Sequence, residues 1–588
     1  MKKTGAWLVR YALEQLGIQQ TFGIPGVHNT EIYDELNNSE SITPMLVTHE
    51  CSAAFMADAI SRTSDAIGTL VIVPAAGATH AASGIGEAFL DGIPMLVISG
   101  GVRSDSAYQY QLHDMDQHAM LAPITKKTYK VSSQGEIVTT LYDAYTLATS
   151  GEPGPVFVEI PVDLQLYKSE VASLPTYSDY QGHADQSQQI ASQNEELDRA
   201  VELLSQAKQP GLFLGWGAVD VSDACIKIAD LLAAPVSTTL QGLSAFPANH
   251  PLHTGMSFGP AAVPAATEAF EGCDCLLAIG TRFGEIGTGS FGVSVPENLI
   301  HIDINPKVLS ANYPAKVALE GDAKEIVPAL LARLAQKLEA LNIDRVHDRT
   351  SISAKIAQNK KAYREQWYQH DSKGRVNPAR FFDALRSKLP DDGIVVVDDG
   401  NHTFLTAELM PIHRPRGMIS PTDFNCMGYA VPATIATKIA NPDKDVVGII
   451  GDGAFLMTCM EIVTASLNNV GAIFTVFNDG ELSQISQAQE VPYNRKTCSV
   501  LAETRFQGVA QATGAEYICI EADDAIAGQL DKAWDIAQQG SPVILDVKID
   551  YSKKTRFTQG VVGTNLKRLP FKAKVRMVSR ALVRKVTG

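Results

Sequence analysis

Two residues with oxygen-bearing side chains stand beside glycines at the two ends of an apolar stretch, residues 451–480, which reads GDGAFLMTCMEIVTASLNNVGAIFTVFNDG. Asp452 lies between two glycines, and Asn478 follows 26 positions later. A carboxylate and an amide oxygen are hard ligands, and Mg²⁺ combines few such protein ligands with phosphate oxygens and water. The pair therefore predicts a metal-bridged diphosphate site, although the same residue types are also ordinary at turns.

The segments around these two residues predict that they meet at one edge of a sheet. DVVGIIGDG predicts a strand that ends at Asp452, the residues after it have a helical period, and AIFTVFNDG predicts the following strand. Parallel strands end at the same edge, where open α/β sheets bind their ligands. Gly451 and Gly453, with Ala454 after them, would let a phosphate approach the free amides at the start of the helix.

The whole chain has the pattern of an α/β protein. Short apolar runs such as TLVIVPA, PVFVEIP, CLLAIGTRF and GIVVVDDG alternate with helical patterns, which predicts parallel sheets covered by helices on both faces. Two polar stretches, near 174–196 and 344–367, are the predicted linkers. They divide the chain into doubly wound domains at 1–173, 190–343 and 368–550, followed by a tail at 551–588.

Charge and composition exclude several classes of protein. The 588 residues have a formal net charge of −16, but residues 551–588 carry eleven Lys or Arg and no acid, so residues 1–550 carry −27. Such an acidic body predicts no binding to nucleic acid. The eight cysteines show no metal-ligand spacing. No run of 18 apolar residues occurs, and the start, MKKTGAWLVRYALEQLG, suits an amphipathic helix and not a signal peptide, which predicts a cytoplasmic location.

The spacing of Asp452 and Asn478 resembles the thiamine diphosphate motif, in which Gly-Asp-Gly is followed along the chain by an Asn. Residues from about 4 to 550 resemble the acetolactate synthase family and its decarboxylase and oxidase relatives. The resemblance implies thiamine diphosphate and Mg²⁺ as cofactors, with the metal held by Asp452, Asn478 and the main-chain carbonyl of Gly480. The three domains would then be pyrimidine-binding, central Rossmann-like and diphosphate-binding.

Four further segments carry the same resemblance. FGIPGVHNTEIYDEL is similar to the family's opening segment, and THECSAAFMADAISR is similar to the segment whose Glu, here Glu50, activates the cofactor ring. DDGNHT resembles the loop that contacts the diphosphate, with Gly400, Asn401 and His402, and NCMGYAVPA resembles the segment whose apolar residue, here Met427, bends the cofactor. In the family the Glu and the diphosphate site come from different subunits, which implies a homodimer or homotetramer with active sites at the subunit interface.

The resemblance implies a small-molecule 2-oxo acid as substrate, and four departures bear on its fate after decarboxylation. Val27 stands where pyruvate decarboxylases have Asp, and the chain has no adjacent His pair, which disfavours simple aldehyde release. His113 stands near the Gln of the family's Phe-Gln-Glu, and His80 ends AAGATH where the family has Asn, so both are candidate catalytic residues. We therefore expect carboligation, with a 2-oxo acid decarboxylase or a flavin-dependent oxidase as alternatives. The retained motif residues together disfavour a catalytically silent homologue.

The central unit leaves the binding of a nucleotide open. FLGWGA, AIGTRF and LIHIDINP resemble the family's central domain, which binds FAD in some members and nothing in others. Gly215, Gly217 and Asp303 are compatible with a nucleotide. However, the Asp-Asp-Arg that flavin-binding synthases carry after Arg-Phe is replaced by Gly-Glu-Ile at residues 284–286. FAD is therefore compatible with the sequence but not favoured.

The tail predicts an amphipathic helix after Pro570. Apolar residues at positions 571, 575, 578, 582 and 586 fall on one stripe at helical spacing, and the basic residues lie elsewhere on the surface. Such a helix can dock on the acidic body or lie on an anionic membrane surface as a peripheral contact. Docking is the favoured prediction, because the tail is always close to its own body.

Overall fold

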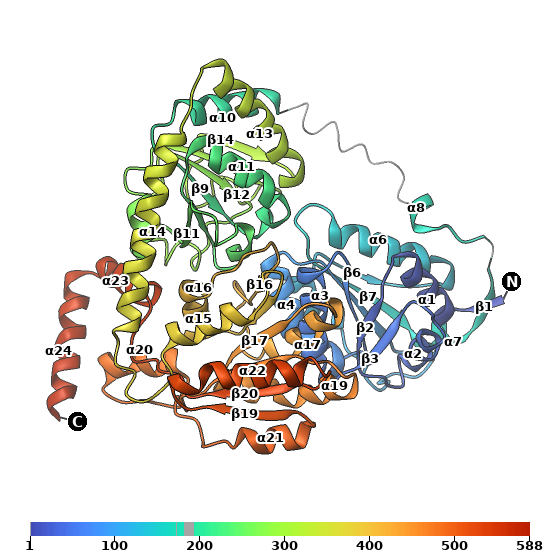
Figure 1. The fold of residues 1–588 in the computed structure, drawn as a ribbon. Helices are drawn as coiled ribbons and strands as arrows, with labels where there is room; N and C mark the ends of the chain where they lie inside the picture. Colours follow the sequence, from blue (N-terminus) through green and yellow to red (C-terminus); the bar gives the residue numbers. More distant parts are fainter. Residues whose placement is uncertain (1, 172, 181–192, 588) are drawn as a thin grey trace.

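The computed structural model describes residues 2–171, 173–180 and 193–587, in which three parallel sheets of six strands are each flanked by helices (Figure 1). The predicted α/β class with three doubly wound parallel sheets is confirmed. An antiparallel ribbon of β1 (Lys2–Thr4) and β8 (Lys168–Glu170) pairs the two ends of the first domain. The predicted linker at 174–196 lies mostly outside the described residues.

The N-terminal sheet has the strand order β3-β2-β4-β5-β7-β6. Its strands are β2 (Gln20–Gly23), β3 (Thr43–Leu46), β4 (Gly68–Ile72), β5 (Met95–Gly101), β6 (Lys127–Lys130) and β7 (Pro155–Pro161). Its helices are α1 (Gly5–Gln15), α2 (Thr30–Asn37), α3 (Glu50–Thr63), α4 (Ala76–Asp91), α5 (Gln117–Leu121), α6 (Ile137–Thr149), α7 (Val162–Leu166) and α8 (Tyr177–Tyr180). The strand order reverses between β2 and β4, which opens a crevice at the carboxyl edge.

The central sheet has the strand order β11-β10-β9-β12-β13-β14 and reverses between β9 and β12. Its strands are β9 (Pro210–Leu214), β10 (Val236–Thr238), β11 (His253–Met256), β12 (Cys275–Ile279), β13 (Asn298–Asp303) and β14 (Val317–Glu320). Its helices are α10 (Asn194–Gln206), α11 (Ser222–Leu232), α12 (Pro264–Ala269) and α13 (Ala323–Ala340).

The C-terminal sheet has the strand order β16-β15-β17-β18-β20-β19 and reverses between β15 and β17. Its strands are β15 (Ile394–Val397), β16 (Met418–Ile419), β17 (Val446–Gly451), β18 (Ile473–Phe477), β19 (Glu516–Ile520) and β20 (Val543–Val547). Its helices are α15 (Pro378–Lys388), α16 (Asn401–Leu409), α17 (Ala430–Ala440), α18 (Asp452–Thr458), α19 (Ile462–Leu467), α20 (Ser483–Tyr493), α21 (Phe506–Thr513) and α22 (Ile526–Ala537). The loops after β15 and β17 therefore flank the same crevice.

The polar stretch at 344–367, which we predicted as a linker, is almost entirely helical. It forms α14 (Val346–Tyr368), which runs along the molecule from the central to the C-terminal domain (Figure 1). Only Ile356, Tyr363 and Trp367 are buried along its length. The rest of the molecule covers only this narrow face of the helix, so most of its residues are polar, as in a linker. Tertiary contacts along the buried face stabilise the segment as a helix.

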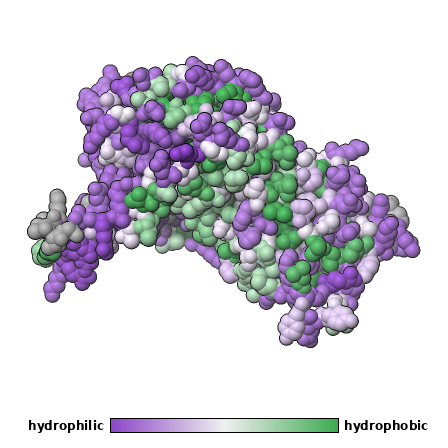
Figure 2. All heavy atoms as spheres, turned by 90° about the horizontal axis from the view of Figure 1, so that it is seen from below, coloured by the Kyte–Doolittle hydropathy of each residue, from purple (hydrophilic) through white to green (hydrophobic). Residues whose placement is uncertain are grey.

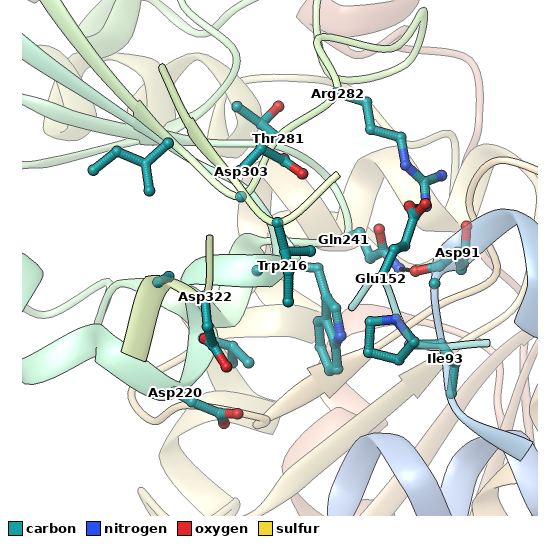
Figure 3. Close-up of a pocket in the computed structure, with 18 of the residues that line it drawn as sticks. Asp91, Ile93, Glu152, Trp216, Asp220, Gln241, Thr281, Arg282, Asp303 and Asp322 are labelled. Carbon is teal, nitrogen blue, oxygen red and sulfur yellow. Dashed lines mark hydrogen bonds and ion pairs between the residues drawn. The ribbon is translucent and has the colours of Figure 1, made fainter. Parts of the chain in front are cut away.

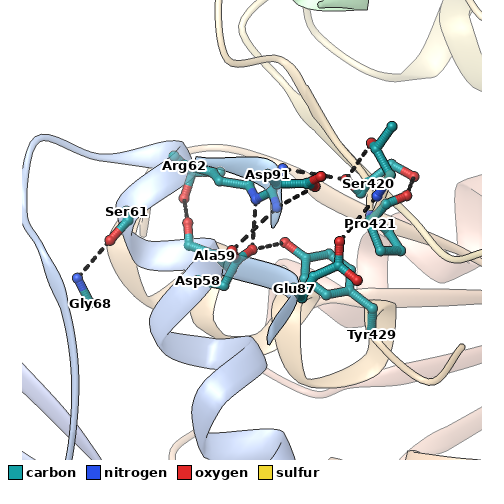
Figure 4. Close-up of polar contacts among 12 residues, drawn as sticks. Asp58, Ala59, Ser61, Arg62, Gly68, Glu87, Asp91, Ser420, Pro421 and Tyr429 are labelled. Atoms are coloured by element: carbon teal, nitrogen blue, oxygen red, sulfur yellow. Dashed lines mark hydrogen bonds and ion pairs between the residues drawn. The ribbon is translucent and has the colours of Figure 1, made fainter. Parts of the chain in front are cut away.

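A buried ionic network fastens α3 of the N-terminal domain to the C-terminal domain (Figure 4). Arg62 is fully buried and contacts Asp58 at 2.6 Å and Asp91 at 2.8 Å. The Tyr429 hydroxyl donates to Asp58 at 2.6 Å. Glu87 accepts the backbone N–H groups of residues 422 and 426, and burial raises its pKa to about 9. The network therefore positions the loop that precedes Met427.

The basic tail forms two helices, α23 (Arg556–Arg568) and α24 (Phe571–Thr587). The ring of Phe557 stacks on Phe404, with centroids 4.2 Å apart. Arg584 of α24 donates to the Pro492 carbonyl at 3.0 Å, and its guanidinium lies over the Tyr493 ring of α20. The two tail helices therefore contact the C-terminal domain, and contact of the tail with a membrane stays a prediction. Among the described helices, none combines the length and apolar composition needed to cross a membrane.

Candidate active site

The carboxyl edge of the N-terminal sheet gathers the first group of predicted site residues. Val27 follows β2, Glu50 follows β3, His80 lies in α4 after β4, and His113 lies in the loop after β5. Because parallel strands end at the same edge, segments far apart along the chain meet there. Val27 itself is 68% exposed, so its side chain is open to a ligand or to a second subunit.

Glu50 is the first residue of α3 and is only 7% exposed. Its Oε2 lies 2.9 Å from Nδ1 of His80, and the His80 ring stacks on His49 with centroids 4.6 Å apart. In the described part of the chain, Oε1 of Glu50 has no hydrogen-bond partner. Glu50 is therefore paired with His80, and its other oxygen is left for a ligand. His49 also belongs to this group of residues, although it was not predicted from the sequence.

His113 lies against His28, which was also not predicted. The two rings have centroids 5.1 Å apart, and Nδ1 of each is buried without a hydrogen-bond partner among the described residues. Burial lowers the pKa of His28, with His113 as a smaller cause. Two histidines that are not adjacent in the sequence therefore form a pair in space, so the missing His pair no longer counts against aldehyde release, whereas Val27 in place of Asp still does.

The C-terminal sheet carries the second group of predicted residues. Gly451 at the end of β17 pairs with Phe477 at the end of β18, so Asp452 and Asn478 follow neighbouring strand ends. Asp452 is 3% exposed; its Oδ1 accepts the Gly453 amide at 2.8 Å and its Oδ2 accepts the Gly480 amide at 2.7 Å. Burial raises the pKa of Asp452, while these hydrogen bonds lower it. Asp452 therefore ties the two turns together.

Asn478 and Gly480 present oxygens at the same turn. The Asn478 side chain donates its amide to Oδ1 of Asp546 at 3.0 Å, which leaves its oxygen as an acceptor. The carbonyl of Gly480 accepts the Leu501 amide at 2.8 Å, and a carbonyl oxygen has a second lone pair for a metal. Gly480 has φ of +81°, a conformation that favours glycine.

A second acid at this turn, Asp479, was not predicted although it directly follows Asn478. Its Oδ1 is buried without a partner among the described residues, and burial raises its pKa to about 6, with Asp452 as a further cause. The Tyr551 hydroxyl is also buried and has no partner among the described residues; burial raises its pKa, and the charges of Asp479 and Asp452 raise it further. Two buried carboxyl groups and hard oxygen donors form a set that a divalent cation fits.

The loop after β15 holds the predicted Gly400, Asn401 and His402. The ring of His402 is buried, and its Nε2 accepts the amide of Gly451 at 3.3 Å. Burial lowers the pKa of His402 to about 3, so the ring is neutral. The buried His402 ring therefore connects the turn at Gly400 to the turn at Gly451. Asn401 is the first residue of α16 and lies at the crevice.

Asp398, at the end of the same strand, was not predicted and positions Met427. Its Oδ1 accepts the Gly428 amide at 2.9 Å and its Oδ2 accepts the Ala430 amide at 2.7 Å. Met427 is partly buried and packs against the core between the N-terminal and C-terminal domains. Ala454, in the first turn of α18, is buried in the same core.

The central domain borders a cavity of about 620 Å³ at the reversal point of its sheet (Figure 3). Gly217 and Asp303 line it, as expected for a nucleotide site, and Gly215 lies at the adjoining strand end. Eight carboxylic side chains and three basic ones line it. The basic groups are already paired: Arg282 with Glu152 at 2.6 Å, and Lys324 and Arg416 both with one acid, Asp220. In the described residues the cavity offers no unpaired cation to a diphosphate.

Three parallel-sheet domains with polar groups at their carboxyl edges are typical of α/β enzymes, which bind ligands at these edges. Three family models match in chain order: the N-terminal TPP binding domain of thiamine pyrophosphate enzymes at residues 3–120, their central domain at 197–330, and their C-terminal TPP binding domain at 398–547.

Curated relatives match over most of the chain. The acetolactate synthase large subunit of Corynebacterium glutamicum is 30% identical over 555 residues, which cover 93% of this chain and 86% of that protein. The probable acetolactate synthase large subunit of Methanocaldococcus jannaschii is 30% identical, with 93% and 92% covered. The isozyme 3 large subunit of Escherichia coli is 28% identical, with 94% and 95% covered. The chain belongs to the thiamine pyrophosphate enzyme family and is an enzyme resembling acetolactate synthase large subunits.

Proposed function

We propose that this enzyme uses thiamine diphosphate and Mg²⁺ to decarboxylate a 2-oxo acid and to join the remaining fragment to a second carbonyl compound. The observation that carries the proposal is the pair of buried acids, Asp452 and Asp479, beside the oxygen donors of Asn478 and Gly480. The joining step is supported by the similarity to acetolactate synthase large subunits.

Each group has a defined task in this proposal. Asp452, Asn478 and the Gly480 carbonyl would hold Mg²⁺, and the turns at Gly400 and Gly451 would receive the diphosphate. When bound, thiamine diphosphate supplies the electron sink for decarboxylation. The free Oε1 of Glu50 would accept a hydrogen bond from the cofactor ring, and His80 would hold or deliver a proton at Oε2.

The reaction class is tested by product analysis. The protein loaded with thiamine diphosphate and Mg²⁺ is incubated with pyruvate alone and with pyruvate plus candidate carbonyl acceptors, and CO₂ and organic products are measured by mass spectrometry. We expect one CO₂ to be released for each molecule of joined product. That product should contain all carbons of the acceptor and all carbons of pyruvate except the one lost as CO₂. Aldehyde formed in equal amount to CO₂, with no joined product, would contradict carboligation.

Release of an aldehyde is the second candidate function, and the pairing of His28 with His113 favours it. Two neighbouring imidazoles, one with a lowered pKa, can pass a proton to a developing carbon nucleophile. The same product analysis separates the two functions, because a protonated fragment leaves as an aldehyde and never carries acceptor carbons.

The proposed site needs a second subunit, and one exposed face suits that contact. The helices that begin at Asp452, α18 and α19 with the short helix between them, expose five large apolar side chains, namely Leu456, Met457, Met460, Val463 and Leu467. Figure 2 shows apolar side chains gathered across one face of the molecule. Apolar surface of this kind marks interaction sites.

We expect the double substitution Val463→Asp with Leu467→Asp to convert a dimer or tetramer to a monomer and to remove most turnover, because two buried charges would be unpaired in the interface. Light scattering after size exclusion gives the mass, and Leu341→Asp, at a similarly exposed site on the central domain, is the matched control. An unchanged mass for the double variant would show that the interface lies elsewhere.

The acidic central cavity disfavours FAD in this enzyme. We expect the purified protein to be colourless and to show no flavin absorbance, because a diphosphate would meet a lining in which every described cation is already paired. Titration with FAD, followed by flavin fluorescence, should give no saturable quenching up to ~100 μM, so any binding would be weaker than about −5.5 kcal/mol. A yellow protein with one flavin per chain would contradict this expectation and reopen the oxidase alternative.

A further inference from the structure

A second, smaller cavity lies at the junction of three parts of the chain. Its volume is about 180 Å³, and it is bordered by β11 of the central domain, by the connecting helix α14 and by the end of α16 in the C-terminal domain. None of the residues assigned above to the cofactor or to the metal lines it. Its polar lining consists mainly of His253, Lys360, Tyr363, Arg364 and Glu408.

Lys360 places a largely buried amine at this cavity without a counter-ion. Its Nζ lies 3.3 Å from Nδ1 of His253 and 3.5 Å from the Ala248 carbonyl, and no carboxylate of the described chain lies within 4.0 Å of it. Burial lowers the pKa of Lys360 to about 8, so the amine is mostly protonated at neutral pH. A buried ammonium group is stable only when an anion or several hydrogen bonds satisfy it.

Two further nitrogen atoms around the cavity lack acceptors. His253 is 6% exposed, and because its Nδ1 accepts from Lys360, its proton lies on Nε2, which has no partner among the described residues. Nη1 of Arg364 is likewise unpartnered, although its Nη2 contacts the Leu409 carbonyl at 2.8 Å and Asp383 at 3.0 Å. Both atoms are fully buried, so Lys360 is the donor that the cavity offers, and His253 and Arg364 are the nitrogen-bearing side chains beside it.

Glu408, the acid of the cavity, is already satisfied by other groups. Its Oε1 accepts the Phe557 amide at 2.8 Å, and its Oε2 accepts the Tyr363 hydroxyl and the Arg556 amide. Burial raises its pKa to about 7, which reduces its negative charge near neutral pH. Glu408 therefore anchors the start of α23 and does not serve as the partner of Lys360.

We propose that this cavity binds a small organic carboxylate, whose charged end meets the amine of Lys360 and whose carbon chain packs on the apolar wall. That wall is formed by residues such as Leu243, Val263, Met410 and Ile412. Inorganic phosphate fits less well, because its remaining oxygens would face apolar side chains without hydrogen bonds. A ligand bound there contacts the central domain, α14 and the C-terminal domain together, so it would hold their relative positions.

Butyrate is a suitable probe, because it is a carboxylate without the 2-oxo group that the active site requires. Calorimetric titration of the enzyme loaded with thiamine diphosphate and Mg²⁺ should show saturable binding to one site per chain. Lys360→Met keeps the length and apolar character of the side chain, and we expect it to weaken butyrate binding at least tenfold. Lys355→Met is the matched control, because Lys355 lies on the same helix, is exposed and pairs with Glu268 at 3.6 Å; its affinity should be unchanged.

Two further measurements make the outcome decisive. Butyrate should bind Asp452→Ala protein normally, which separates this site from the active site and from any failure of the proposed reaction. In the unmodified protein, butyrate should slow the acetylation of Lys360 at pH 8, measured by peptide mass spectrometry, so the test does not depend on the folding of a variant. The proposal is overturned if butyrate does not bind saturably, if Lys360→Met binds it equally well, or if phosphate binds in its place with higher affinity.

Discussion

Replacing Glu50 by Gln is expected to lower kcat by ~10²–10⁴-fold, the usual contribution of a positioned acid or base, while thiamine diphosphate and Mg²⁺ still bind. Glu50 is buried at the start of α3, and one of its oxygens has no partner in the described chain. In the proposed role this carboxylate activates the cofactor ring and does not anchor it. A glutamine of the same shape keeps an oxygen but loses the negative charge.

Cofactor titration and steady-state turnover, measured on the same preparation, distinguish activation from anchoring. Glu40→Gln changes an exposed acid of the same domain and should leave both quantities unaltered. If Glu50→Gln bound cofactor poorly while its bound fraction turned over at the normal rate, the assigned role would be wrong. A lower rate with unchanged cofactor affinity would support it.

Asp452→Ala should abolish metal-dependent binding of the cofactor, with affinity reduced by on the order of 100-fold or more, at least the loss seen when an outer partner of a metal ligand is removed. Asp452 offers one of two predicted side-chain ligands. It also accepts the amides of Gly453 and Gly480, so both turns lose an anchor. The loss therefore combines a missing ligand with a less ordered site.

Asp452→Asn is the control that separates these two effects, because its side-chain oxygen still accepts one amide while the charge is removed. Calorimetric titration of each variant with thiamine diphosphate, at several Mg²⁺ concentrations, gives the affinity and its dependence on metal. Circular dichroism checks that the apo proteins are folded. Wild-type affinity in Asp452→Ala protein, with the same magnesium dependence, would rule out the metal site proposed at this turn.

Sequence patterns alone predicted the α/β class and the edge at which the cofactor residues would lie. Apolar runs of strand length between helical patterns require parallel sheets, and a crossover between two such strands brings Asp452 and Asn478 to one edge. The resemblance of five segments to those of a known family also predicted the family, which the matched domains confirm. The fold class and the shared edge depend on local patterns and on neighbouring strands, so periodicity and spacing are enough to reveal them, whereas the family came from the resemblance of the motifs.

Tertiary structure alone decided which groups become partners across long stretches of chain. The contact of Glu50 with His80, the pairing of His28 with His113, and the buried amine of Lys360 beside a cavity have no signal in local periodicity. Their partners come from different strand ends or different domains, and burial is set by everything that packs around them. The segment 344–367 was predicted as a linker from its polar composition; its helical form was not predicted, because the helix is stabilised by the narrow face that the fold covers.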